Sequence, residues 1–318
     1  MKKILLSLFA VLLSCSALAI DVEIDGINYS LNEITRKASV ISKSPTYSGD
    51  VGIPSSVTYS DVNYSVTSIG SRAFADCTDF TSIEIPNSVT WIEGDAFNGC
   101  SNLTRVTLDS NAIVSKEYGE YQWATGTYTS LGTIFGKQVK EYIIGNSVTT
   151  IGYSAFRGCS GLTDIEIPNS VSTISELAFS GCTGLTDIEI PNSVTSIGDL
   201  AFYKCSGMTS IICEATIPPA MGTSVFYNVD KSACILCVPA ASVNAYKSAN
   251  QWKDFYNILP YDPTGIEDIN ITDVNNHKSY FDFGGREIPM LQKGMNIVKK
   301  TNKLRSEERR VGKACRSR

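Results

Sequence analysis

The chain has 318 residues, of which 43% are hydrophobic and 19% are charged, and this composition is typical of a folded protein. A largely disordered chain is excluded, because such chains contain too few apolar residues to form a core. The formal net charge of −5 at pH 7 argues against binding to the phosphate backbone of nucleic acids and against attraction to anionic lipids.

Residues 1–19, MKKILLSLFAVLLSCSALA, contain the three parts of an export signal. Two lysines form the basic part, residues 4–13 form an apolar stretch, and Ala-Leu-Ala forms a small-x-small cleavage site. The apolar stretch is too short to span a bilayer, so no transmembrane span is predicted here. A lipoprotein signal at Cys15 is the alternative. Either signal predicts an exported protein, extracellular or on the cell surface.

The next part of the chain is dominated by an internal repeat of 23 residues. Its most constant phrase is IPNSV, which occurs at residues 85–89, 167–171 and 190–194, with IGNSV at 144–148. The predicted organisation is an N-terminal cap (20–52), repeats (53–208) with one unit stretched by an insertion (104–138), and a terminal coil with a C-terminal cap (209–262).

Each repeat is interpreted from its residue pattern. In TDIEIPNSVTSIGDLAFYKCSGM, apolar and polar residues alternate over the first strand, and Pro-Asn-Ser then forms a corner. A short second strand and one or two helical turns follow. A single unit of this length buries too little apolar surface, but stacked units bury it jointly. The sequence therefore predicts a solenoid of stacked parallel sheets, mainly β with short helical turns.

Stacking places equivalent residues of successive units side by side, so the repeats predict ladders of identical side chains. Three such ladders are expected: one of phenylalanines, one of cysteines and one of hydrogen-bonded asparagines. The asparagine ladder comprises Asn87, Asn146, Asn169 and Asn192. The phenylalanine ladder, interpreted as core rather than as a ligand groove, comprises Phe74, Phe97, Phe135, Phe156, Phe179, Phe202 and Phe226. The cysteine ladder comprises Cys77, Cys100, Cys159, Cys182 and Cys205.

The ladder cysteines are interpreted as small buried hydrophobic residues. Exported proteins often pair their cysteines, but identical side chains in register point in parallel, which suits disulfide geometry poorly. Pairing of Cys213 with Cys234 or Cys237 is left open. No metal site is predicted, because the CxxC at 234–237 has no second pair and no nearby histidine.

Signatures of catalysis and of cofactor binding are missing from the repeats. His277 is the only histidine and lies beyond them, and no phosphate-binding or dinucleotide-binding motif occurs. Carboxylates do recur on the predicted strands. They are interpreted as a solvated charged face or, alternatively, as an acidic surface for a basic partner or cation, while catalysis is the third reading. These residues are Glu84, Glu141, Asp164, Glu166, Asp187 and Glu189.

The insertion in the stretched unit is rich in aromatic residues, SKEYGEYQWATGTYTS over residues 115–130. Insertions in solenoids often form loops on the binding face, and Tyr and Trp are common in binding hot spots. The alternative is a flap that covers the distorted coil beneath it. The four aromatic residues are Tyr118, Tyr121, Trp123 and Tyr128.

The IPxSVTSIGxxAFxxC pattern resembles the repeats of the BspA-like leucine-rich repeat proteins, over about residues 21–262. The resemblance implies a repeat solenoid of leucine-rich-repeat type. It also implies an exported surface protein without enzymatic activity, cofactor or metal, which adheres to host matrix proteins or to other cells. A structural envelope protein and a carbohydrate-binding accessory protein are the alternatives. The expected partner is thus a host matrix or surface protein, with a glycan as the alternative, and the oligomeric state is not predicted.

The C-terminal part of the chain has two further segments. Residues 263–304 resemble the sorting domains of secreted Bacteroidetes proteins, through the alternating YFDFGGREIPML stretch and its Gly-Gly-Arg turn. Residues 305–318 resemble the translation of a sequencing adapter, with a solvated basic tail as the alternative. This tail contributes +4 and the two signal lysines +2, so the remaining chain has a formal charge of −11.

Overall fold

The computed structural model describes residues 19–122, 127–261, 280–281 and 287–288. The chain divides into two compact units, residues 1–262 and 263–318. In the second unit, the described residues form an antiparallel pair, β22 (Tyr280–Phe281) with β23 (Glu287–Ile288). The rest of the sorting-like segment, the tail 305–318, and residues 1–18 of the export signal lie outside the described residues.

The N-terminal sheet begins with three antiparallel strands, β1 (Ala19–Ile24), β2 (Ile27–Asn32) and β3 (Lys37–Val40). Asp25 and Gly26 between β1 and β2 both have positive φ, the conformation of a two-residue hairpin turn. The sheet continues in β6 (Val62–Ile69), which is parallel to β3 and antiparallel to β5 (Ser56–Tyr59). Because β6 also pairs with β8 (Trp91–Ile92), this sheet is continuous with the repeats.

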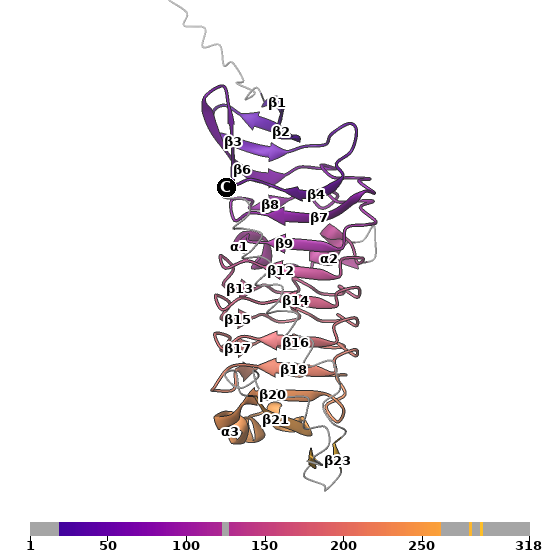
Figure 1. Cartoon of the computed structure of the whole chain (residues 1–318), viewed down its shortest axis with the longest axis vertical. Coiled ribbons are helices and arrows are strands. Elements are labelled where there is room, and N and C mark those ends of the chain that lie inside the picture. Colours follow the sequence, from indigo (N-terminus) through magenta and orange to yellow (C-terminus); the bar gives the residue numbers. More distant parts are fainter. Residues whose placement is uncertain (1–18, 123–126, 262–279, 282–286, 289–318) are drawn as a thin grey trace, which may run out of the picture. The chain divides into compact units, whose positions relative to one another are not determined.

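The first strands of successive repeats lie parallel and side by side (Figure 1). Along each strand buried and partly exposed residues alternate, as in Asp187–Ile190, where both isoleucines are buried. The strands form two blocks. The first is β4 (Gly49–Gly52), β7 (Phe80–Ile85), β9 (Arg105–Leu108), β12 (Glu141–Ile144) and β14 (Asp164–Glu166); the second is β16 (Asp187–Ile190), β18 (Ser210–Cys213), β20 (Ile235–Pro239) and β21 (Asn257–Tyr261).

The short second strands form a row of their own. In β15 and β17, Thr173 pairs with Ser196 and Ile174 pairs with Ile197, with the isoleucines buried. The row comprises β13 (Thr150–Ile151), β15 (Thr173–Ile174), β17 (Ser196–Ile197) and β19 (Ala220–Met221). The predicted fold class, a repeat solenoid of stacked parallel sheets that is mainly β, is therefore confirmed.

The stretched unit replaces the short second strand by a helix. α1 (Asn111–Val114) is capped by Ser110, whose Oγ accepts from the Ile113 amide at 3.2 Å, and the Val114 carbonyl accepts from the Gly152 amide of the next coil at 2.9 Å. The insertion contains the hairpin β10 (Tyr121–Gln122) and β11 (Thr127–Tyr128). α2 (Leu131–Phe135) then restores the repeat.

The last coil is covered by a cap that buries two large aromatic side chains. The cap consists of η1 (Ala240–Ser242), α3 (Val243–Ser248) and η2 (Trp252–Asp254). Trp252 Nε1 donates to the Pro219 carbonyl at 3.0 Å, and the Tyr246 hydroxyl donates to the Ala215 carbonyl at 2.7 Å. Because both polar atoms are satisfied, these rings can fill the end of the apolar core at little polar cost.

The phenylalanine ladder lies in the core as two regular stacks. Phe156, Phe179, Phe202 and Phe226 follow one another at centroid distances of 5.1, 5.2 and 5.2 Å, with ring planes 4–5° apart. Phe74 and Phe97 form the other stack at 5.0 Å. The spine is not continuous as expected, because the stretched unit interrupts it.

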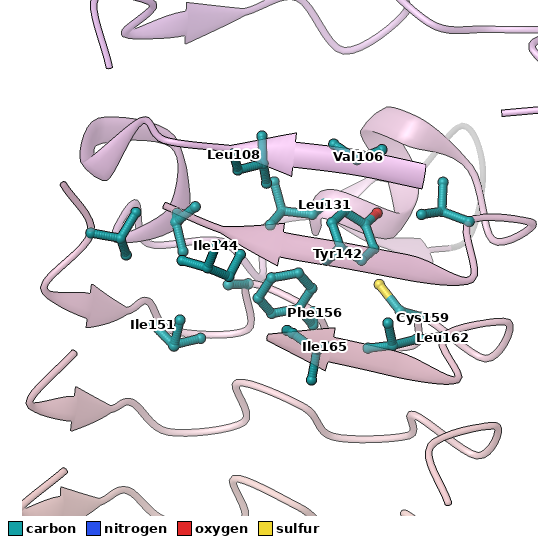
Figure 2. Packing of buried hydrophobic residues seen from close by; sticks show 14 of the residues in the cluster. Val106, Leu108, Leu131, Tyr142, Ile144, Ile151, Phe156, Cys159, Leu162 and Ile165 are labelled. Carbon is teal, nitrogen blue, oxygen red and sulfur yellow. The ribbon is translucent and has the colours of Figure 1, made fainter. Parts of the chain in front are cut away.

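Tyr142 causes the interruption (Figure 2). It stands opposite Val106 and Ile165 in the strand register, where other coils have a smaller aliphatic side chain. Its ring meets Phe156 edge-on at 5.0 Å and 72°, and meets Phe135 at 6.3 Å and 68°. An additional large ring therefore fills the space where α2 replaces the usual turn.

The expected asparagine ladder is wrong, because these four asparagines are exposed at the corners. The neighbouring serine makes the repeated bond instead. Ser170 Oγ donates to the Val148 carbonyl and Ser193 Oγ to the Val171 carbonyl, both at 2.6 Å. The shorter side chain of serine points back along the stack and reaches the preceding coil.

The ladder cysteines are buried free thiols. Cys182 Sγ donates to the Phe156 carbonyl and Cys205 Sγ to the Phe179 carbonyl, both at 3.1 Å, and Cys100 does the same toward Phe74 at 2.9 Å. Cys213, Cys234 and Cys237 are also free thiols. These three thiols thus satisfy a backbone carbonyl of the preceding coil while filling a small apolar space.

Candidate binding surface

The outward side chains of the first strands form two rows across the strand face. Glu141 stands between Arg105 and Asp164 in one row, and Ile143 stands between Thr107 and Glu166 in the other. The first row begins with Asp50, which stands beside Ser82, and Ser82 stands beside Arg105. The second row includes Glu84, which stands beside Thr107. In the second block Asp187 pairs with Ser210 and Glu189 with Ile212. All six predicted carboxylates therefore lie on this strand face.

Carboxylates on this face have hydrogen-bond partners, such as Asp187, which accepts from Thr186 Oγ1 at 2.8 Å. Arg105 Nε donates to Glu141 Oε2 at 2.7 Å, and the Glu141 side chain is only 13% exposed. The expectation of a uniformly solvated row is wrong for this residue. Asp50 accepts from Ser82 Oγ at 2.7 Å and from Thr81 Oγ1 at 2.8 Å, and these hydrogen bonds lower the pKa of its carboxyl.

Within the described repeats, the first-strand sheet is interrupted at one place, between β14 and β16. Neighbouring coils are joined by bonds such as Thr163 N to Lys140 O at 2.9 Å and Thr209 N to Thr186 O at 2.7 Å. The period of 23 residues places Asp164 opposite Asp187, and Glu166 opposite Glu189, at this interruption. Directly opposed like charges destabilise strand pairing, and we attribute the missing backbone pairing between these neighbouring strands to this repulsion, whereas Arg105 offsets the charge of Glu141 where that residue stands beside Asp164.

Removing the repulsion is expected to stabilise the protein. Asp187→Asn combined with Glu189→Gln should raise the free energy of unfolding by about 1 kcal/mol at low ionic strength, because two like-charge pairs disappear. The gain should shrink in 1 M salt, which screens such charges. Urea unfolding at both ionic strengths measures this, with Glu117→Gln in the insertion as control. A destabilised double variant would contradict the explanation.

The insertion does not present all of its aromatic residues. Tyr118 is only 6% exposed, and its hydroxyl donates to the Ile113 carbonyl of α1 at 2.8 Å. Burial raises the pKa of this phenol above its ordinary value. Tyr118 as an exposed binding residue was therefore wrong; it covers the distorted coil, as the flap alternative expected.

The other three aromatic residues of the insertion remain predictions. Tyr121 and Tyr128 are in register in the antiparallel pair β10–β11. Trp123, and the side chains of both tyrosines, lie outside the described residues. The Gly119 amide donates to the Thr129 carbonyl at 3.0 Å and closes the stem of the hairpin, while the Tyr118 amide donates to the Tyr153 carbonyl at 2.9 Å and joins the insertion to the next coil.

An exposed tryptophan beside the insertion was missed. Trp91 is the first residue of β8 and is 48% exposed. Its Nε1 donates to Glu93 Oε1 at 2.9 Å, and Lys116 Nζ lies 4.2 Å from the ring centroid. The sequence pattern could have indicated this residue, because a tryptophan replaces a small side chain of the repeat. At the equivalent position, β13, β15, β17 and β19 have Thr150, Thr173, Ser196 and Ala220.

Comparison with known proteins identifies the repeat. The family described as BspA type leucine rich repeat region matches residues 54–125 and 133–247 in six copies, which is more than half of the chain. The chain belongs to the BspA-type leucine-rich repeat family. No curated protein matches it in sequence. For this BspA-type protein, the family agrees with the interpretation made from the IPNSV and AFxxC motifs.

The solved structures that match the chain include two leucine-rich repeat proteins and a pneumococcal antigen. A leucine rich cell surface protein from Faecalibacterium prausnitzii is 22% identical, with coverage of 70% of this chain and 72% of that one and a TM-score of 0.39. A leucine-rich repeat protein from Bacteroides ovatus is 24% identical (coverage 76% and 77%, TM-score 0.33). The pneumococcal vaccine antigen PcpA is 15% identical (coverage 70% and 71%, TM-score 0.38).

The described part of this BspA-type protein contains neither a membrane-spanning helix nor a metal-binding cluster. None of its helices has the length and apolar character needed to cross a bilayer. Among the same residues, no group of three or more His, Cys, Asp or Glu side chains is placed to hold a metal ion.

Proposed function

We propose that this BspA-type protein is an exported, non-enzymatic surface protein that binds protein ligands and serves in adhesion to host matrix proteins or to other cells. The observation that carries the proposal is the strand face, where outward side chains stand in rows and neighbouring strands within a row are about 4.8 Å apart. A solenoid offers such an extended surface to a ligand that follows the rows. The export signal of residues 1–19 supports the location.

The chemistry of the strand face indicates a basic ligand. Asp164, Glu166, Asp187 and Glu189 are partly exposed on two successive coils. An acidic patch steers a basic partner during its encounter and disfavours acidic ones. The stacked phenylalanine core beneath the strands keeps the rows in place before binding, which lowers the entropic cost of association.

The test is binding of the purified full chain to immobilised extracellular-matrix proteins, measured by biolayer interferometry. A variant with Asp164→Asn, Glu166→Gln, Asp187→Asn and Glu189→Gln should bind at least about tenfold more weakly, a loss of about 1.4 kcal/mol. Its association rate should also depend less on salt. Circular dichroism would confirm that the variant is folded.

A second acidic variant provides the control. Glu33→Gln with Asp61→Asn removes exposed carboxylates from two turns of the N-terminal sheet. This variant should bind like the unaltered protein. If the folded protein bound none of the matrix proteins, or if the strand-face variant bound equally well, the adhesion proposal would fail and a structural role in the envelope would be favoured.

A further inference from the structure

A line of small hydroxyl side chains leads away from Trp91. Ser68 of β6 is in register with Trp91, Ser39 of β3 is in register with Ser68, and Ser30 of β2 is in register with Ser39. All three serines are partly exposed, so they share the outward face with the indole. We call Ser30, Ser39 and Ser68 the serine track. With Trp91 it spans three strand spacings, about 14 Å.

The indole at the end of the track is held in place from two directions. Glu93 accepts its Nε1 proton at 2.9 Å, and Lys116 lies over the ring at 4.2 Å. Lys116 Nζ is also 5.7 Å from the buried Tyr118 ring, so the lysine is itself anchored. A large exposed aromatic ring that is already ordered loses little conformational entropy when a ligand stacks on it.

Only one face of the indole is occupied by these contacts. Lys116 follows α1, which belongs to the coil after β8, whereas the serine track begins in the coil before it. The other face of the ring is therefore on the side of Ser68, whose short side chain leaves space above it. An incoming ring would lie on the serine track and against Trp91.

The polarity of this surface distinguishes between ligand classes. An apolar side chain of a protein partner binds best in a desolvated pocket surrounded by other apolar groups. Trp91 instead has hydroxyl neighbours on one side, the Glu93 carboxylate at its edge and the Lys116 ammonium over its opposite face. A pyranose ring matches this arrangement, because it has a C–H face for the indole and a rim of hydroxyls for the polar groups.

The geometry points to a glycan-binding site, in which a sugar ring stacks on Trp91 and the neighbouring sugars lie along the serine track. Glu93 would accept hydrogen bonds from sugar hydroxyls at the edge of the ring, and Lys116 would hold the indole from the opposite face. This site goes beyond the proposed protein binding and lies away from the four strand-face carboxylates. The length of the track favours an oligosaccharide over a single sugar.

The test is a glycan array probed with the full chain, followed by titration calorimetry with the best oligosaccharide bound. Trp91→Ala should weaken binding at least about tenfold, whereas Trp91→Phe, which keeps a flat ring, should stay within about fivefold. Ser39→Gln fills the track without touching the indole and should weaken binding of the oligosaccharide more than of its terminal monosaccharide. Tyr256→Ala, at a tyrosine that is 75% exposed elsewhere, is the control.

The outcomes separate the glycan site from protein adhesion. Glycan binding that is lost in Trp91→Ala and retained in Tyr256→Ala supports the site, whatever happens to matrix-protein binding. Absence of any glycan ligand for the folded protein overturns it, as does equal binding by Trp91→Ala. If Trp91→Ala lost only a protein ligand, Trp91 would be a protein anchor and the glycan site would also be overturned.

Discussion

Alkaline unfolding of the repeats is expected to begin just above pH 9. In an unfolded chain the cysteine thiols ionise near their ordinary pKa of 9.0, whereas burial raises the pKa of Cys100, Cys159 and Cys205 to about 12 in the folded protein. Between these values unfolding releases a proton from each thiol, so stability falls as the pH rises. Below pH 9 the stability that these neutral thiols contribute is fully present.

The expected loss of stability is large because several coils contain such a buried thiol. Each such thiol lowers the free energy of unfolding by about 1.4 kcal/mol per pH unit. Three thiols together lower it by about 4 kcal/mol per unit, which is comparable with the total stability of many domains. The protein should therefore unfold within a few pH units above 9.

The measurement is urea unfolding at several pH values between 9 and 10, a range below the ordinary pKa of tyrosine. Cys205→Ala removes one thiol and should reduce the slope of stability against pH by about 1 kcal/mol per unit over this range, since the unfolded thiol is only half ionised at pH 9. Its stability at pH 7 is also lower. A slope that is unchanged in Cys205→Ala would show that the ladder thiols do not govern the alkaline transition.

Phe179→Ala is expected to be the most damaging single substitution in the regular repeats. Phe179 is fully buried and stacks on Phe156 at 5.1 Å and on Phe202 at 5.2 Å. Truncation leaves a cavity in the middle of this stack and should cost about 3–5 kcal/mol. Chemical denaturation of the variant measures the loss.

A matched control comes from the surface of the same coils. Tyr227 also stacks on a neighbour, with 5.6 Å between its centroid and that of Tyr203, but it is 55% exposed. Tyr227→Ala should change stability by no more than about 0.5 kcal/mol, because an exposed ring buries little surface. If both variants lost similar stability, stacking rather than burial would be the main contribution of the phenylalanine ladder.

The repeat explains why so much of the fold was predictable. Ile188 and Phe202 have equivalents one period away, and a side chain that meets the same neighbour in every coil must be buried in all of them. The solenoid, its parallel sheets and its core positions follow from this periodicity. The corner bond did not follow, because Asn192 and Ser193 are both polar and only geometry decides that the serine reaches the preceding coil.

Prediction was weakest where the period fails. In the stretched unit, α1 replaces a strand, Tyr118 folds inward over it, and Tyr142 interrupts the phenylalanine spine. No periodic argument applies to these residues, because each has a neighbour that no other coil has. A composition rule that counts exposed aromatic residues in insertions placed Tyr118 on the surface and overlooked Trp91.

The sequence by itself determined the architecture, since a repeated pattern of apolar residues leaves stacking as the way to bury them. The tertiary structure decided the surfaces. It separated β14 from β16, where identical carboxylates would be opposed, and it paired Glu141 with Arg105 across two strands. It also aligned three serines from separate strands beside Trp91. Such arrangements depend on contacts between coils, and contacts across the stack are set by register and by charge rather than by local sequence pattern.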